Sequence, residues 1–295
     1  MPPEIPFLDE SDNVRGPLAK ARVLFTDLDG TLLGLRASLL TDSAGTTTVE
    51  TVQAIAALNR AGLSVVVTSG RNTRQLRELT RLLDWPDFIG ELGCLRSYDR
   101  GQVFEFDTGV WSEGCLVAGE TPFDAIERSG AVDALLENFP GLIEYHDPWH
   151  LDREVTHLMR GNVPFVEAQA ALNGLPLPVS LVDNGIIRPL QHGLVGVDEI
   201  HAYHLVPTGT SKEASVAAYL AARGIAADEA IAVGDSAADV GMADVVGTAF
   251  CVANGLADPA LMAAAARRDN VVALRGMRGA GWAELAYAWL EAKQA

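Results

Sequence analysis

Short runs of β-branched and aromatic residues alternate with segments of helical periodicity in the first third of this chain of 295 residues. Strand-like runs lie at residues 22–26, 63–68 and 88–92, and helical patterns lie between them at 46–61 and 71–83. Strands that alternate with helices form parallel sheets covered on both faces, because the chain must cross back before each new parallel strand. We therefore predict an α/β fold built on a doubly wound parallel sheet.

This alternation is interrupted near residue 94 and resumes near residue 210. It then continues with a helix at 211–223, strands at 230–234 and 248–252, and helices at 258–268 and 281–292. The intervening stretch has many Gly and Pro residues and segments of strand-like alternation, which indicates an inserted α+β module. We predict a Rossmann-like core with an α+β cap domain. The predicted parts are a flexible tail at 1–18, a core at 19–93 and 205–295, and a cap at 94–204.

Charge and cysteine content limit the partners of the chain. The net charge is −17, so the surface repels nucleic acid and anionic membranes, and we expect neither as a partner. Cys94, Cys115 and Cys251 are widely spaced, as expected for free thiols in a reducing compartment. The first residues lack the pattern of a signal peptide, and no apolar run has the roughly 20 residues that span a bilayer. These features predict a cytoplasmic protein and leave its oligomeric state open.

Two pairs of aspartates follow predicted strands. Asp27 and Asp29 come directly after the first strand, and Gly30 lets the chain turn so that both can face one point. Asp235 and Asp239 follow a later strand, one in a loop and one on the first helical turn, so both can face one cation. One carboxylate of such a site can attack phosphorus while another transfers a proton. Each pair alone is equally compatible with an ordinary turn or helix start.

Two further segments place polar residues at strand ends. Ser69, Gly70 and Arg71 join the second strand to the second helix, where a hydroxyl and free N–H groups can hold a phosphate oxygen. Lys212 lies at a helix start, where a bound phosphate would explain a charge that opposes the helix dipole. Taken singly, Ser69 fits an N-cap and Lys212 a surface lysine. Together with the acidic pairs they favour a phosphate site, because ligands of open α/β sheets bind at the carboxyl ends of strands.

These four segments resemble the four motifs of the haloacid dehalogenase superfamily over about residues 21–290. The motif D-x-D-G-T-L corresponds to residues 27–32, the strand followed by S/T-G-R to 65–71, the lysine to Lys212, and G-D-S-x-x-D to 234–239. The insertion lies between the second and third motifs, as in the C2-cap branch and its Cof-like or sugar-phosphatase group. Two positions depart from the pattern of relatives, which often have Asn at Ala238 and Asn-Gly at residues 91–93.

The resemblance implies a Mg²⁺-dependent phosphatase acting on a small phosphate monoester, such as a sugar phosphate or related metabolite. Asp27 would attack phosphorus and form a phosphoaspartyl intermediate, while Asp29 would protonate the leaving oxygen and then activate water. Ser69 and Lys212 would hold the phosphoryl oxygens. The implied ligands of Mg²⁺ are Asp27, Asp29 through its backbone carbonyl, Asp235 and the supporting Asp239.

Substrate contacts and alternative functions are less constrained. Gly70 and Arg71 are expected near the phosphate because they belong to the second motif, and Arg160 is a candidate substrate contact in the cap. A phosphotransferase or phosphosugar mutase on the same scaffold would need a cap that excludes water and holds a second phosphate. The sequence shows no concentrated arginine cluster for that purpose. A non-catalytic, metal-binding regulatory protein is disfavoured, because Asp27 and Asp29 are both present.

Overall fold

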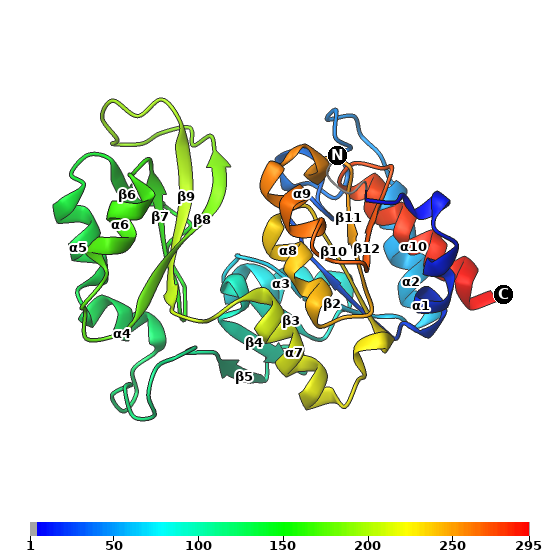
Figure 1. The fold of residues 1–295 in the computed structure, drawn as a ribbon, viewed down its shortest axis with the longest axis horizontal. Helices are drawn as coiled ribbons and strands as arrows, with labels where there is room; N and C mark the ends of the chain where they lie inside the picture. The colour runs from blue at the N-terminus through cyan, green and yellow to red at the C-terminus, as the bar shows by residue number, and fades with distance from the viewer. Residues whose placement is uncertain (1–4, 295) are drawn as a thin grey trace. The chain divides into compact units, whose positions relative to one another are not determined.

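The structure is a computed structural model that describes residues 5–294 (Figure 1). The chain divides into two compact units, and each is treated by itself. Unit 1 consists of Met1–Gly70, Leu76–Phe104 and Ser211–Ala295, and unit 2 consists of Arg71–Gln75 and Glu105–Thr210. The predicted combination of a Rossmann-like α/β core and a second α+β unit is confirmed.

Unit 1 is built on an eight-stranded sheet in the order β12-β11-β10-β1-β2-β3-β4-β5, counted over the described residues. Both β10 and β2 pair with β1 in parallel register, which places β1 in the interior, where all four of its residues are buried. Only apolar and β-branched residues meet that requirement, and Val23–Thr26 supplies them. The strands are β1 (Val23–Thr26), β2 (Ser64–Thr68), β3 (Phe88–Gly90), β4 (Leu95–Tyr98), β5 (Val103–Phe106), β10 (Ala230–Gly234), β11 (Thr248–Cys251) and β12 (Val271–Ala273).

Helices cover the two faces of this sheet, as a doubly wound fold requires (Figure 1). One face packs against α7 (Lys212–Arg223), α8 (Ala237–Gly241) and α9 (Pro259–Ala265). The other carries α1 (Arg15–Lys20), α2 (Glu50–Ala61) and α10 (Gly279–Gln294), and α3 (Thr73–Leu83) starts in unit 2 and continues in unit 1. Within residues 5–294, every helix is too short or too polar to pass through a bilayer.

The N-terminal segment differs from the predicted flexible tail over residues 1–18. From residue 5 onward it lies against the sheet edge, where Phe7 bridges Ala273 of β12 and the Ala273 N–H donates to the Pro6 carbonyl at 2.9 Å. Val14 and Leu18 are buried. The polar composition of the segment concealed this role, because a few apolar residues suffice to cover an edge strand. Residues 1–4 of the predicted tail lie outside the described part.

The core sheet also continues beyond residue 94, where the sequence placed the start of the cap. Both β4 and β5 extend the sheet past β3, and β4 runs antiparallel to β3. The change of sequence pattern therefore marks a switch in strand direction. The long segment of unit 2 runs from Glu105 to Thr210, whereas the predicted cap spans residues 94–204. The short edge strand β12 was absent from the prediction.

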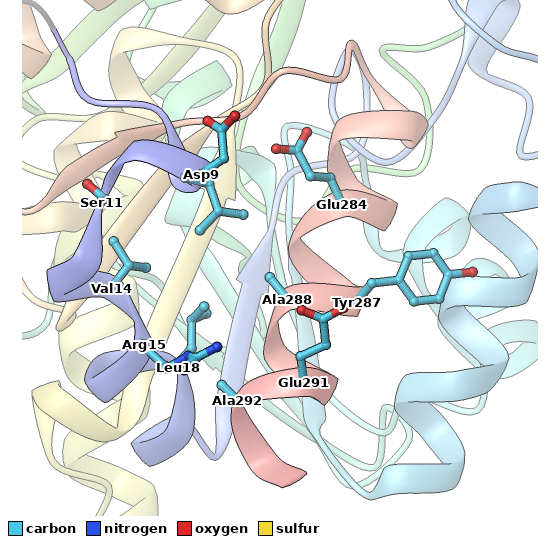
Figure 2. Close-up of a pocket in the computed structure, with 11 residues that line it drawn as sticks. Asp9, Ser11, Val14, Arg15, Leu18, Glu284, Tyr287, Ala288, Glu291 and Ala292 are labelled. Atoms are coloured by element: carbon cyan, nitrogen blue, oxygen red, sulfur yellow. The ribbon is translucent and has the colours of Figure 1, made fainter. Parts of the chain in front are cut away.

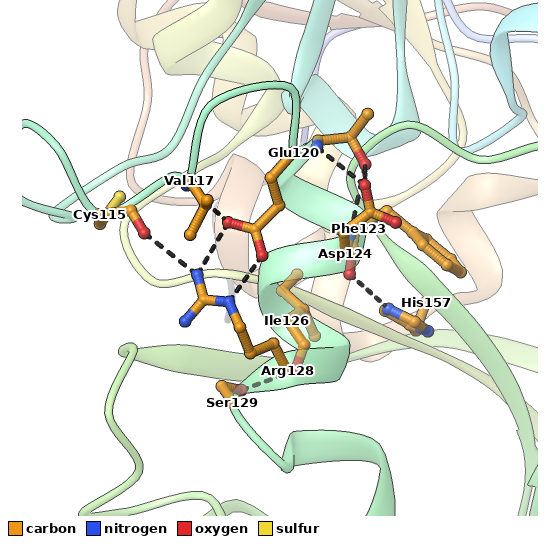
Figure 3. A network of polar contacts seen from close by, with 10 residues as sticks. Cys115, Val117, Glu120, Phe123, Asp124, Ile126, Arg128, Ser129 and His157 are labelled. Carbon is orange, nitrogen blue, oxygen red and sulfur yellow. Dashed lines mark hydrogen bonds and ion pairs between the residues drawn. The ribbon is translucent and has the colours of Figure 1, made fainter.

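Unit 2 packs three helices on one face of an antiparallel sheet in the order β6-β7-β9-β8. Its strands are β6 (Ile143–Tyr145), β7 (His157–Gly161), β8 (Val179–Ile187) and β9 (Ile200–Pro207), and its helices are α4 (Pro122–Arg128), α5 (Ala131–Asn138) and α6 (Phe165–Ala171). A capping box between Thr121 and Asp124 begins α4. Arg128, the last residue of α4, donates two hydrogen bonds back to Glu120, which precedes the N-cap, at 2.6 and 2.8 Å (Figure 3).

The carbonyl of Phe123 on α4 also fixes the imidazole of His157 on β7 (Figure 3). Nε2 of His157 donates to this carbonyl at 3.0 Å, and the ring stacks on that of Phe123. Nδ1 is buried and, within the described residues, has no hydrogen-bond partner. Burial lowers the pKa of His157 to about 4, and nearby Arg153 acts in the same direction. His157 is therefore neutral in the folded protein at neutral pH.

Acidification is expected to destabilise the protein through His157. Between pH 6.5 and about 4 the unfolded chain binds a proton that the folded chain excludes, so the free energy of unfolding falls in this window. At pH 5 the loss attributable to His157 is about 2 kcal/mol. Urea unfolding at pH 7.5 and 5.0 should show a smaller pH-dependent loss in His157→Gln than in the wild type. The exposed His192 serves as control, and equal pH-dependent losses in His157→Gln and His192→Gln would contradict the assignment.

Candidate active site

Two parallel neighbours in the middle of the sheet bring the predicted aspartates together. Thr26 of β1 lies opposite Val233 of β10, so Asp27 and Asp235 leave the sheet side by side at its carboxyl edge. The Asp27 N–H still donates to the Val233 carbonyl at 3.0 Å, which fixes where the loop starts. Strand pairing thus brings Asp27 and Asp235 together although they are far apart in the sequence.

Lys212, at the start of α7, joins two of these carboxylates. Its Nζ lies 2.8 Å from Asp27 Oδ1 and 2.7 Å from Asp239 Oδ1. All three side chains are buried. Burial favours the neutral amine, but the two carboxylates outweigh it and raise the pKa of Lys212. The lysine is thus a fixed positive charge inside the site, rather than the surface side chain that its sequence context alone would suggest.

Asp235 and Asp239 are held by different sets of donors. Asp239 Oδ2 accepts from the Ser236 hydroxyl at 2.6 Å and from the N–H groups of Ser236 and Asp235, which makes it part of the capping box of α8. The two oxygens of Asp235 accept from the Thr31 hydroxyl at 3.4 Å and from Asn254 Nδ2 at 3.1 Å. Neither Thr31 nor Asn254 was among the site residues predicted from the sequence, although Asn254 follows the carboxyl end of β11 and so lies at the expected edge.

Together these carboxylates form a group suited to a cation. Asp27, Asp235 and Asp239 each offer an oxygen, and the three oxygens lie within 4.8 Å of one another. Burial raises the pKa of Asp27 to about 8 and that of Asp235 to about 6, and the neighbouring carboxylates add to both shifts. Three carboxylates against one lysine leave the group short of positive charge. A divalent cation with a preference for oxygen ligands, such as Mg²⁺, fits this donor set.

Glycines allow the loops to approach this closely. Gly30 has φ +93°, and a Cβ at this position would overlap the carboxylate of Asp235. At Gly234 a Cβ would overlap the side chain of Asp239. Both positions therefore need glycine for space, and Gly30 needs it for its backbone conformation as well.

Asp29, Ser69, Gly70 and Arg71, also predicted for the site, are not members of the carboxylate group. The side chain of Asp29 is exposed and is not a member of the group of three oxygens. Ser69 is buried at the end of β2, the strand beside β1, and its N–H donates to the Ile89 carbonyl at 2.9 Å. Gly70 follows it, half-buried, and the half-buried Arg71 belongs to unit 2.

Arg160, predicted to bind substrate, is an internal residue of unit 2. It is buried on β7, and its Nε lies 2.7 Å from Glu144 Oε1 on the neighbouring strand β6. Its Nη1 also donates to the Asp147 carbonyl at 3.3 Å. The guanidinium borders a cavity of about 710 Å³ that Tyr145 and His192 line as well. Its charge is thus already balanced within unit 2.

A separate cavity in unit 1 lies between the N-terminal segment and α10 (Figure 2). It measures about 660 Å³, and its lining includes Asp9, Arg15, Tyr287 and Glu291. None of the predicted site residues lines it. This cavity and the carboxylate group at the sheet edge are therefore two different places in unit 1.

Comparison with known proteins gives both a family and a fold. A model of the haloacid dehalogenase-like hydrolases matches residues 24–103 and 196–268, more than half of the chain. A phosphoglycolate phosphatase of Methanospirillum hungatei is 28% identical over 244 residues, covering 80% of this chain and 86% of that protein. Protein 0175 of Thermoplasma acidophilum has a TM-score of 0.60 at 16% identity, covering 93% of this chain and 99% of that one. The sucrose-phosphatase of Synechocystis sp., solved with sucrose and phosphate, has a TM-score of 0.58 at 15% identity, with 91% and 98% covered.

Replacing Gly30 by alanine should impair cation binding. The added Cβ would displace the Asp235 carboxylate, so we expect Mn²⁺ to bind at least about 10-fold more weakly when titrated and followed by electron paramagnetic resonance. Gly62 is a matched control, because its φ is +82° and a Cβ there meets open space. Gly62→Ala should lose roughly 1 kcal/mol of stability and keep its Mn²⁺ affinity. Equal affinities in the two variants would contradict the role of Gly30.

Proposed function

The chain belongs to the haloacid dehalogenase-like hydrolases, and from this premise we propose that it hydrolyses small phosphate monoesters with Mg²⁺ as cofactor and Asp27 as nucleophile. The observation that supports the proposal most directly is the buried group in which Lys212 contacts Asp27 and Asp239 beside Asp235. Such a group combines a nucleophile, a fixed positive charge and a set of cation ligands at the edge where α/β folds bind ligands.

In the first step, an oxygen of Asp27 would form a bond to phosphorus while the ester P–O bond breaks. Lys212 holds Asp27 Oδ1 at 2.8 Å, so the carboxylate is oriented and its other oxygen can point toward the phosphoryl group. The same ammonium group stabilises the ionised form that attack requires. Bound Mg²⁺ would offset the charge of the carboxylates and polarise a phosphoryl oxygen.

Asp29 would transfer the protons. It lies two residues after the nucleophile, on the loop that Gly30 turns, and its exposed side chain is outside the carboxylate group. As an acid it would protonate the departing ester oxygen, and as a base it would then take a proton from the water that attacks the phosphoaspartyl group. That second step releases phosphate and restores the Asp27 carboxylate. Ser69 would hold a phosphoryl oxygen at the end of β2.

The proposed substrate is a small phosphorylated metabolite, either a sugar phosphate or a phosphorylated hydroxy acid. The phosphoglycolate phosphatase of Methanospirillum hungatei and the sucrose-phosphatase fold of Synechocystis sp. support these two classes. A panel containing 2-phosphoglycolate and several sugar phosphates, assayed by phosphate release, would rank them by kcat/KM. Failure to hydrolyse any of them, or p-nitrophenyl phosphate, in the presence of Mg²⁺ would refute the proposed function.

Asp27→Asn should abolish hydrolysis of p-nitrophenyl phosphate. The amide is a poor nucleophile, so we expect kcat/KM to fall by at least about 10³-fold. Asp228→Asn is a suitable control, because Asp228 is an exposed aspartate of unit 1 that pairs with Lys20 on the surface. Removal of divalent cations with EDTA should inactivate the wild type, and Mg²⁺ should restore it. Full activity of Asp27→Asn would disprove the nucleophile assignment.

Asp29→Asn should separate proton transfer from cation binding. We expect kcat to fall by about 10²- to 10⁴-fold, because the amide can neither donate nor accept the required proton. Its Mn²⁺ affinity should match the wild type, since the Asp29 side chain is not among the three grouped carboxylates. Loss of Mn²⁺ binding in this variant would assign the side chain to the cation instead.

A further inference from the structure

Asn254 connects three parts of unit 1 that surround the carboxylate group. Its Nδ2 donates to the Gly30 carbonyl at 2.9 Å and to Asp235 Oδ2 at 3.1 Å. Its Oδ1 accepts from the Arg278 N–H at 2.8 Å, immediately before α10. One amide therefore joins the loop of the proposed nucleophile, a proposed cation ligand and the start of the last helix.

We propose that Asn254 is a positioning residue for the cation site, which it maintains by fixing the Asp235 carboxylate and the loop at Gly30 relative to each other. This inference rests on the proposed function, because it assigns to Asn254 a task in binding the cofactor of that reaction. The amide oxygen of Asn254, its one atom able to bind a cation, accepts from the Arg278 N–H instead.

The orientation of the Asn254 amide is determined by its partners. The Arg278 N–H can only donate, so it must face the amide oxygen. The Gly30 carbonyl and the Asp235 carboxylate can only accept, so both must face the NH₂ group. All three contacts agree on one orientation, and a flipped amide would oppose all of them. The residue is thus locked, as a group that positions another must be.

The backbone around Asn254 is built for close approach to Asp235. A Cβ at Gly255 would lie 2.6 Å from the Asp235 carbonyl oxygen and 2.9 Å from its Cα. On the other side, a Cβ at Gly30 would overlap the Asp235 carboxylate. Asp235 therefore lies between two glycine-containing turns, and the side chain of Asn254 is the hydrogen-bonded link between them.

Fixing Asp235 matters because its carboxylate would otherwise rotate. With Thr31 on Oδ1 and Asn254 on Oδ2, each oxygen has one donor and keeps a lone pair for a cation. The hydrogen bond to the Gly30 carbonyl also restrains the peptide group that follows Gly30. This peptide group is next to the one that carries the Asp29 carbonyl, which is a proposed cation ligand. Partners of this kind typically contribute about 10- to 100-fold to metal affinity.

The experiment measures Mn²⁺ binding by electron paramagnetic resonance in the full-length wild type and in Asn254→Ala, together with the thermal unfolding of each protein without metal. We expect the dissociation constant to rise about 10- to 100-fold in the variant. The Mg²⁺ concentration for half-maximal phosphatase activity should rise in parallel, while kcat at saturating Mg²⁺ stays close to the wild type. Asn254→Leu, of similar shape and without donors, is the second variant in case the alanine form does not fold.

Asn270→Ala is the matched control. Asn270 is also half-buried in unit 1, and its Nδ2 donates to the carbonyls of Ala243, Val246 and Gly247. We expect this variant to lose thermal stability and to keep its Mn²⁺ affinity. Wild-type Mn²⁺ affinity in a folded Asn254 variant, or an equal loss in Asn270→Ala, would overturn the inference while leaving the proposed function intact. Absence of Mn²⁺ binding in the wild type would instead refute the cofactor assignment of the proposed function, and the inference with it.

Discussion

The contact of Lys212 with two buried carboxylates is the interaction on which the rest of the site depends. It joins the end of β1, the start of α7 and the first turn of α8 at distances of 2.8 and 2.7 Å. Buried charges are tolerated only when paired, so removing the ammonium group would leave Asp27 and Asp239 uncompensated at a cost of several kcal/mol. The same pairing that positions the Asp27 carboxylate therefore also makes its burial possible.

Both elements that carry this contact are anchored away from it. The Thr26 hydroxyl donates to the Asp27 carbonyl at 2.8 Å and accepts from Nε1 of the fully buried Trp282 at 3.0 Å. On α7, the hydroxyl of Tyr219 donates to the buried carboxylate of Asp87, next to β3, at 2.7 Å. The backbone at Asp27 is thus tied to α10, and the helix of Lys212 is tied to the sheet. Neither can shift without breaking buried hydrogen bonds.

The fold and the carboxylate group could be predicted because they follow from rules that act over short distances. A buried strand followed by an aspartate, as at Asp27 and Asp235, can be recognised from local sequence. Parallel pairing of β1 with β10 then brings the two aspartates together. No such local pattern marks Asn254, because its hydrogen bond to the Gly30 carbonyl joins residues that are 224 positions apart in the sequence. The contact of Arg160 with Glu144 likewise depends on the register of β6 against β7. Tertiary pairing of this kind cannot be read from one strand.

Helix faces show a similar limit. A spacing of three predicts that one buried face holds Val49, just before α2, and Val52, Ile55 and Leu58 on that helix. Val49 and Val52 are nevertheless exposed, whereas Ala54 is buried. The spacing shows only that an apolar side chain could be buried, and the packing of the neighbouring helix determines which residues are covered. On α2 that neighbour is α10, whose buried residues are mostly glycine, alanine and tryptophan.

Charge balance then couples the proposed cofactor to the proposed substrate. The protein carries a net charge of −17, and the positive charge of Lys212 is already engaged by two carboxylates. A phosphate dianion that approaches three carboxylates, one lysine and the more distant Arg278 meets net repulsion unless a cation is present. A divalent cation reverses that sign locally, because its two charges act at close range on the phosphoryl oxygens. For the proposed reaction, the phosphate and cation affinities of this site are therefore linked, each increasing the other by the same factor.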